Sequence, residues 1–238
     1  GETHVGTVLI DPATGQIDPS WTLQARTGTN GGRVSVKSIK IINNHIYLGG
    51  IFTHFQGNGA PWTYARNGAR LDINGKPDRT WNPEFNGTVI DIDVDENETY
   101  YYAAGYFTRA HNRVVENAGR LSTAAGAELD QSWTFRHSYL IGKYQQTVTA
   151  ANGRVYFGGS QHSLFGYNSD SMTRTSGSIT MYNGGDLQAS TRSATGVVYA
   201  SCHCSDFTFQ DAYQYLTLGT SWTRADEIQW VGGWDEAT

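Results

Sequence analysis

The chain has 238 residues, of which 16% are charged and 13% are aromatic, and it contains 28 glycines. Its net charge of −5 gives no electrostatic reason to expect nucleic acid or an anionic membrane as a partner, and no apolar run approaches the ~20 residues that span a bilayer. Only two cysteines occur, which excludes a scaffold built on disulfides, and the composition is typical of a turn-rich β protein.

The first unit, residues 7–57, has an internal order that the rest of the chain repeats. Its predicted elements are a short strand (8–11), a turn (14–15), a connection that ends on Trp21, an alternating strand (35–41) and an apolar strand that ends in two glycines (46–50). A second unit (68–112) carries Trp81 in its connection, and a third (118–168) carries Trp133. A fourth unit (176–231) matches this pattern only in part, and the next unit begins near residue 232.

The glycine-containing strand returns at a regular interval. Its second small residue stands at 50, 105, 159 and 201, so the steps are 55, 54 and 42 residues. Periods of this size, built from short apolar strands and Asn-Gly turns such as Asn152-Gly153, indicate a β-propeller. We expect the glycine strand to be innermost, where crowded backbones need residues without bulk, and the three repeated tryptophans to pack between neighbouring blades.

Four short segments carry a resemblance to a known type of repeat. They are Gly49–Thr53, Leu71-Asp72, Asp78–Pro83 and Ala104–Thr108. With these segments, residues 7–160 resemble the β-propeller repeats of actinobacterial and phage-associated proteins. The resemblance implies a secreted surface protein or a phage minor tail protein, in which the repeats recognise a cell surface and carry no catalytic signature.

The end of the chain reads like the start of another unit, because Trp234–Thr238 is similar to residues 10–14. We therefore predict that residues 1–238 form a single all-β propeller domain or a fragment of one. The predicted fragment has about four recognisable blades and belongs to a propeller of six or seven.

Three aspartates, Asp91, Asp93 and Asp95, alternate in the way that begins an EF-hand calcium loop. Glu96 stands where that loop needs glycine, and Tyr102 stands where it needs glutamate. We therefore expect these carboxylates to form the solvent face of a strand.

The segment Cys202-His203-Cys204 places two thiols on one side of an extended strand. Their Cα atoms would be roughly 6.5 to 7 Å apart, at the outer limit for a disulfide. Three interpretations stay open: reduced thiols that pack, a local disulfide, or part of a zinc site with ligands such as His111 or His162. We predict no cofactor and no metal site, and these three residues are the weak candidates for one.

Aromatic residues gather in segments that interrupt the repeat. The loop from Phe52 to Asn67 is five residues longer than the matching loop from Phe107 to Asn117. Loops carry function more often than the framework does. The candidates for stacking on a sugar or docking to a protein are therefore Trp62, Tyr64, Tyr139, Tyr144, Tyr167 and Trp222. The alternative is that these side chains cover sheet edges or a neighbouring subunit.

The sequence contains no nucleophile elbow, P-loop or dinucleotide fingerprint, and its 22 acidic residues make some carboxylate pair inevitable. The leading hypothesis is a non-catalytic adhesion module, extracellular, on a cell surface or on a virion, whose loops bind a surface glycan or protein. One alternative is a polysaccharide hydrolase or lyase with its site over the propeller axis. The other is a structural spacer that contacts other chains of a larger assembly. We expect no nucleic-acid partner and no membrane insertion.

Overall fold

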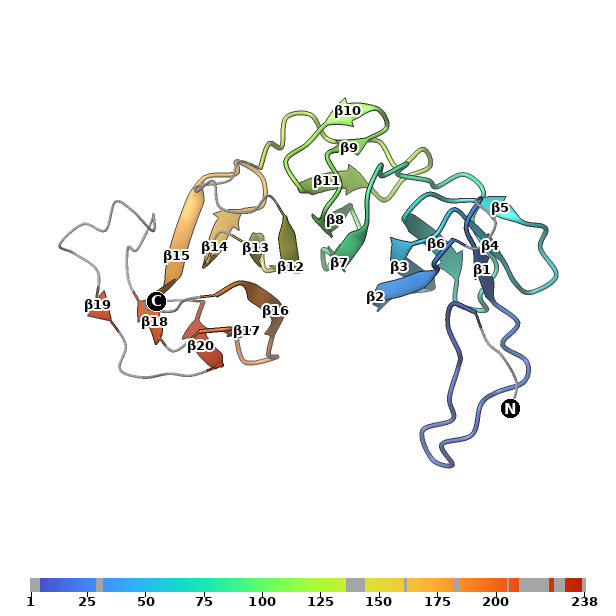
Figure 1. Ribbon diagram of the computed structural model, residues 1–238, viewed down its shortest axis with the longest axis horizontal. Helices are drawn as coiled ribbons and strands as arrows, with labels where there is room; N and C mark the ends of the chain where they lie inside the picture. Colours follow the sequence, from blue (N-terminus) through green and yellow to red (C-terminus); the bar gives the residue numbers. More distant parts are fainter. Residues whose placement is uncertain are drawn as a thin grey trace.

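The computed structural model of the protein describes residues 5–28, 32–135, 144–160, 162–181, 185–204, 206–209, 223–224 and 230–236. Within these ranges every regular element is a β-strand (Figure 1). No helix in the described part of the chain is long and apolar enough to cross a membrane. The predicted all-β class is therefore confirmed.

Four antiparallel sheets, the first to fourth blades, carry the architecture. In the spatial order of their strands, the first is β2 (Ser35–Ile42), β3 (His45–Ile51) and β6 (Gly68–Asp72), and the second is β7 (Val89–Val94), β8 (Tyr100–Gly105) and β11 (Ala118–Ser122). The third is β12 (Gln145–Ala151), β13 (Arg154–Gly159), β14 (Ser163–Asn168), β15 (Arg174–Met181), β18 (Asp206–Phe209) and β19 (Thr223–Arg224). The fourth is β16 (Leu187–Arg192), β17 (Val197–Cys202) and β20 (Val231–Asp235).

Two smaller sheets involve the loops after β3 and β8. One pairs β1 (Gln24–Arg26) with β4 (His54–Gln56) and β4 with β5 (Thr63–Tyr64). The other pairs β9 (Arg109–Ala110) with β10 (Arg113–Val114).

The four blades follow one another in an arc, with the first and fourth blades at its two ends (Figure 1). The strands β2, β7, β12 and β16 lie on the concave side, and each contacts the next one along the arc. This arrangement is a partial β-propeller, as predicted. The second and third units of the sequence each start with the outer strand of one blade, β6 or β11, and continue into the next blade, so these units and the blades are offset by one strand.

The prediction that the glycine strand is innermost is wrong, because β3, β8 and β13 are middle strands. The glycines are needed for two other close approaches. A Cβ atom on Gly49 would lie 2.7 Å from side-chain atoms of Ile92 and Val89 in the next blade. A Cβ atom on Gly105 would collide with the carbonyl oxygen of Thr88, just before its own inner strand.

All four blades share one irregularity of register, and it places their strands in correspondence. A bulge interrupts the pairing of the inner and middle strands near the start of each inner strand. The middle-strand residues paired just before it are Gly50, Gly105, Gly159 and Cys202. The fourth member is therefore Cys202, whereas the sequence spacing assigned residue 201.

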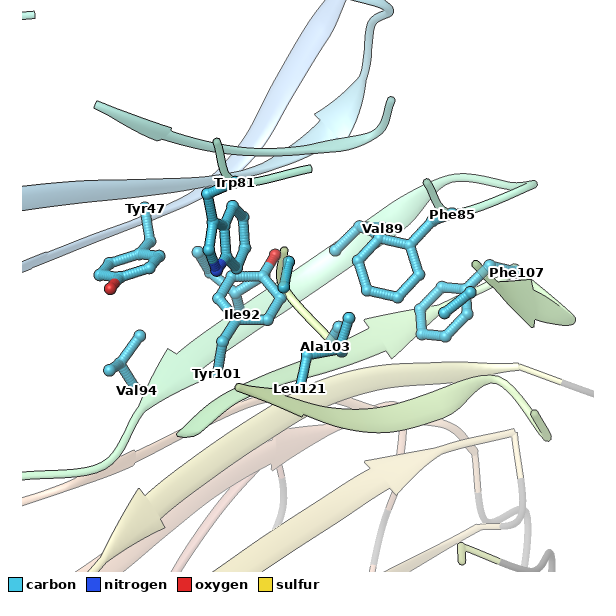
Figure 2. Close-up of a cluster of buried hydrophobic side chains, with 12 residues drawn as sticks. Tyr47, Trp81, Phe85, Val89, Ile92, Val94, Tyr101, Ala103, Phe107 and Leu121 are labelled. Atoms are coloured by element: carbon cyan, nitrogen blue, oxygen red, sulfur yellow. The ribbon is translucent and has the colours of Figure 1, made fainter. Parts of the chain in front are cut away.

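Neighbouring blades are held together by buried aromatic side chains, as Figure 2 shows for the first and second blades. The ring of Trp81 lies 5.4 Å from that of Tyr47 in the first blade and 5.0 Å from that of Tyr101 in the second. Its indole Nε1 donates to the carbonyl oxygen of Ser122 at 3.0 Å. Trp133 is likewise buried at the junction of the second and third blades, whereas Trp21 is half-buried. The predicted packing between blades is confirmed for Trp81 and Trp133.

The expectation that Asp91 and Asp93 face solvent is wrong. Asp91 accepts hydrogen bonds from the hydroxyl of Ser38 at 2.8 Å and from the backbone N–H of Val148 at 2.9 Å. The carboxylate of Asp93, a buried residue, accepts from the N–H of Ala150 at 2.8 Å. Strand β7 has a blade on either side, so alternation of polar and apolar residues in an inner strand does not indicate a solvent-exposed face. Burial raises the pKa of Asp91 above its usual range.

Candidate functional site

One side of the arc, which we call the loop face, is where the middle strands end and the inner strands begin. The inner strands begin there at Ser35, Val89, Gln145 and Leu187. On the opposite side the strands are joined by tight turns, such as Asn152-Gly153, in which both residues have positive φ (49° and 68°). The predicted hairpin turn is confirmed at that pair. The loops that interrupt the repeat after β3 and β8 start from the loop face.

The longer loop of the first blade is anchored by buried aromatic rings. Phe52 and Phe55 are buried, with ring centroids 4.5 Å apart, and they hold strand β4 against β1. Beyond this anchor, the guanidinium of Arg26 lies 4.3 Å from the ring centroid of Trp62. Tyr64 is 45% exposed. These contacts therefore hold the five additional residues of the loop in place.

Tyr64 has a neutral neighbour. Its ring centroid lies 5.3 Å from that of His54, in an edge-on arrangement. Burial, with a smaller effect from the charge of Arg26, lowers the pKa of His54 below its usual value. The imidazole beside Tyr64 is therefore uncharged at neutral pH.

A second group, which we call the tyrosine cluster, consists of Tyr106, Tyr144, Gln146, His162 and Asp186. Tyr106 is 53% exposed, and its ring centroid lies 4.8 Å from that of Tyr144. The hydroxyl of Tyr144 donates to Asp186 Oδ2, and Gln146 Nε2 donates to the same oxygen at 3.0 Å. His162 Nε2 lies 3.6 Å from Asp186 Oδ1.

The cluster joins three blades on the loop face. Tyr106 directly follows β8, Tyr144 directly precedes β12, and Asp186 directly precedes β16. Gln146 is the bulge residue of β12, and bulges turn a side chain out of the regular alternation. Burial, followed by the neighbouring Asp186, raises the pKa of Tyr144 to about 12. The phenol therefore stays protonated at neutral pH and acts as a donor.

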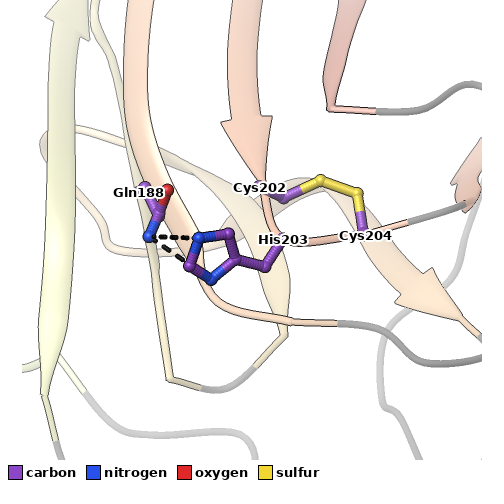
Figure 3. Close-up of a disulfide and its surroundings, with 4 residues drawn as sticks. All are labelled: Gln188, Cys202, His203 and Cys204. Atoms are coloured by element: carbon purple, nitrogen blue, oxygen red, sulfur yellow. Dashed lines mark hydrogen bonds between the residues drawn. A yellow bond between two sulfur atoms is a disulfide. The ribbon is translucent and has the colours of Figure 1, made fainter.

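The two cysteines are joined by a disulfide between Cys202 and Cys204 (Figure 3). Their Cα atoms are 5.2 Å apart, closer than expected, because the chain bends at His203 instead of remaining extended. Both cysteines are buried, while His203 is exposed, with its Nε2 3.1 Å from the side-chain amide nitrogen of Gln188. Of the three interpretations, the local disulfide is the one that the structure contains.

The disulfide also bears on metal binding, because it removes both thiolates as ligands. In the described ranges, no group of three or more His, Cys, Asp or Glu side chains could hold a metal ion.

The structure brings some of the predicted site residues to one face. Trp62, Tyr64 and Tyr144 belong to the loop face, whereas Tyr167 is buried in β14 with its ring 6.0 Å from that of Phe135. Tyr139 and Trp222 lie outside the described residues.

Sequence reasoning missed Tyr106, Gln146 and Asp186. Tyr106 could have been found by aligning the blades, because it follows Gly105 at the position where Ile51 follows Gly50. For Gln146 and Asp186 the repeat offers no comparable signal.

Comparisons with known proteins identify the fold. No family model matches the chain, and no curated protein matches its sequence. The structure of U3-55K is similar to this chain with a TM-score of 0.50 and 7% identity, over 78% of this chain and 50% of that one. The WD40 repeats of RRP9 give 0.48 and 8%, over 78% and 52%, and the computationally designed Ika8 protein gives 0.47 and 8%, over 82% and 49%. The chain thus spans about half the length of these structures, and the likeness to U3-55K shows a propeller-like fold.

Proposed function

We propose that this protein is a non-catalytic recognition module that binds a surface glycan through the aromatic residues of its loop face. One observation carries the proposal: aromatic side chains stand partly exposed on the same face of three successive blades. Trp62 and Tyr64 belong to the first blade, Tyr106 to the second and Tyr144 to the third. The packing between blades does not require these four aromatic residues, because they lie outside the repeated positions that hold the blades together.

The chemistry of the tyrosine cluster suits a sugar. The apolar face of a pyranose ring packs on an aromatic ring, while its hydroxyls need well-placed donors and acceptors. Tyr106 supplies an exposed ring, and Gln146 and Asp186 supply an amide and a carboxylate beside it. Propeller loops also suit a protein partner. An exposed aromatic ring beside an amide and a carboxylate favours the glycan.

One feature supports binding without catalysis. Hydrolysis of a glycosidic bond uses two carboxyl groups that flank the scissile bond. Among the acidic residues in the described part of the chain, Asp186 is the one that contacts Tyr144 and Gln146.

The disulfide supports a position outside the cell, on a cell surface or on a virion. Disulfides persist in oxidising compartments and are rare in the cytosol. The Cys202–Cys204 bond lies in the fourth blade, where its two residues are part of a buried cluster. An extracellular module that recognises glycans meets its ligand there.

A glycan array probed with the folded chain tests this function, and calorimetry on the strongest sugar then measures affinity. We expect Trp62→Ala and Tyr106→Ala each to weaken binding at least tenfold, which is about 1.4 kcal/mol. The control is Asp170→Ala, because Asp170 is exposed in the turn after β14, on the side opposite the loop face. An array without any bound glycan, or equal affinity in all three variants, would reject the proposal. Shortened oligosaccharides after incubation would favour the hydrolase or lyase instead.

A further inference from the structure

The first two junctions between blades are built from the same inner-strand positions. At the first junction, Ile92 and Val94 of inner strand β7 are buried in one cluster with Tyr47 of the preceding blade. At the second junction, the corresponding residues of β12 are Val148 and Ala150, which are buried in one cluster with Tyr102. Strand register establishes the correspondence, because Ile92 and Val148 each occupy the second paired position after the bulge.

The first blade exposes these same positions. The residues of β2 that correspond to Ile92 and Val94 are Ile39 and Ile41, by the same register. They are 50% and 60% exposed. We call this surface, together with the neighbouring exposed Ile73, the start face. Two large aliphatic side chains are therefore left in water at the positions that the first and second junctions bury.

The fourth blade exposes the other half of the junction. Tyr47, Tyr102 and Tyr156 of the middle strands are buried, and each belongs to a cluster that includes residues of the next blade. The corresponding residue of β17 is Tyr199, which is 43% exposed. Ser201 and its cross-strand partner Val231 project on the same side of the sheet as Tyr199. We call Tyr199, Ser201 and Val231 the end face.

The two faces have matching shapes. At the first junction, Gly49 leaves space for Ile92 and Val89, and at the third junction Gly158 leaves space for Leu187. The residue of β17 at this position is Ser201, which is also small. The end face thus offers a tyrosine beside a small residue, and the start face offers the aliphatic side chains that such a surface receives elsewhere in the molecule.

We propose that the end face of one chain docks on the start face of a second copy, so that two chains form a closed ring of eight blades. The two junctions of this head-to-tail pair are equivalent by two-fold symmetry, and closure leaves no junction face in water. Eight blades lie within the range of four to eight found in propellers. The occupant of each exposed face is then a surface of the kind that already covers its equivalents inside the chain.

Light scattering after size exclusion tests the proposal on the unmodified chain, which should have twice the mass of one copy at micromolar concentration. Ile39→Asp and Tyr199→Asp should each shift the chain to the monomer, because each places a charge in both junctions of the pair. Val114→Asp is the control, because Val114 is 72% exposed on β10 and belongs to neither face. Circular dichroism should show unchanged folding in all three variants, and Ile39→Ser and Tyr199→Ser replace any aspartate variant that does not fold.

A mixing experiment tests the head-to-tail geometry. When Ile39→Asp and Tyr199→Asp chains are combined in equal amounts, the mixed pair has one unmodified junction. Association should therefore recover partly in the mixture, although neither variant associates alone. A monomeric unmodified chain at all concentrations overturns the proposal. A pair that resists one of the two aspartate variants overturns it too, because the contact would then join two copies of a single face.

Discussion

The junction between the first and second blades and the loop face are both rich in aromatic residues, but they use them differently. Trp81 is fully buried between two tyrosine rings, and its N–H is bonded to a backbone carbonyl of the neighbouring strand. Tyr106, on the loop face, is more than half exposed. Trp81 recurs in phase with the repeat, whereas Tyr106 stands at a position that is isoleucine in the first blade. Trp81 therefore joins two blades, whereas the ring of Tyr106 is available to a partner.

The largest effect expected from this difference is on stability. Trp81→Ala should lower the free energy of unfolding by about 3 to 5 kcal/mol, because it removes a large buried side chain and leaves a cavity at the junction. Trp62→Ala should cost less than about 1 kcal/mol, since it loses mainly a partly exposed stacking contact with Arg26. Urea denaturation of both variants measures the two values. Equal losses would remove the distinction between framework and loop aromatics.

The glycines of the middle strands provide a second test, of the packing within a blade. Gly105→Ala should lower the free energy of unfolding by about 1 to 3 kcal/mol, because its Cβ would collide with the Thr88 carbonyl oxygen in a packed interior. Gly119→Ala is a matched control, since the added Cβ would lie 3.5 Å from the nearest atom of Leu129, an ordinary contact. Denaturation midpoints compare the two, and a tolerated alanine at residue 105 would contradict the account of the small residues.

The inner aspartates allow a third test. Asp91→Ala should cost about 1 to 2 kcal/mol at neutral pH, because the N–H of Val148 loses its acceptor. Relief from burying a carboxylate, which already raises the pKa of Asp91, offsets part of that cost. Asp170→Ala, at an exposed position, should change the free energy of unfolding by less than about 0.5 kcal/mol. If the two variants lose equal stability, the hydrogen bonds between blades contribute nothing measurable.

The sequence predicted the class of fold and the packing of Trp81 and Trp133, because periodicity and turn residues act locally and recur. It misplaced the glycine strand, because the repeat shows which residues correspond but not which strand is nearest the axis. It also misread Asp91 and Asp93, since alternation shows that a strand has two faces but not whether a second blade covers the polar one. Of the candidate site, the longer loop around Trp62 was visible as an insertion. The tyrosine cluster was not, because Tyr106, Tyr144 and Asp186 meet only when three blades are set side by side.

The smallest effect concerns the rim of the junction between the third and fourth blades, where the charged side chain of Glu236 makes hydrogen bonds. Glu236 accepts from Asn152 at 2.7 Å and from Arg192 Nε at 2.6 Å, and the hydrogen bond from Arg192 is the largest cause that lowers the pKa of Glu236 to about 2. A carboxyl whose pKa is lower in the folded protein stabilises it above the ordinary value of 4.5 and loses that contribution as the pH falls toward 2.

Glu236→Gln should therefore reduce the loss of stability between these two pH values, by less than about 1 kcal/mol because the pair is near the surface. The free energy of unfolding, measured by urea denaturation across this range, checks the difference. Glu128→Gln, a change at an exposed glutamate, is the control and should keep the pH dependence of the unmodified chain. If Glu236→Gln and the unmodified chain lose stability in parallel, ionisation of Glu236 contributes nothing measurable at this rim.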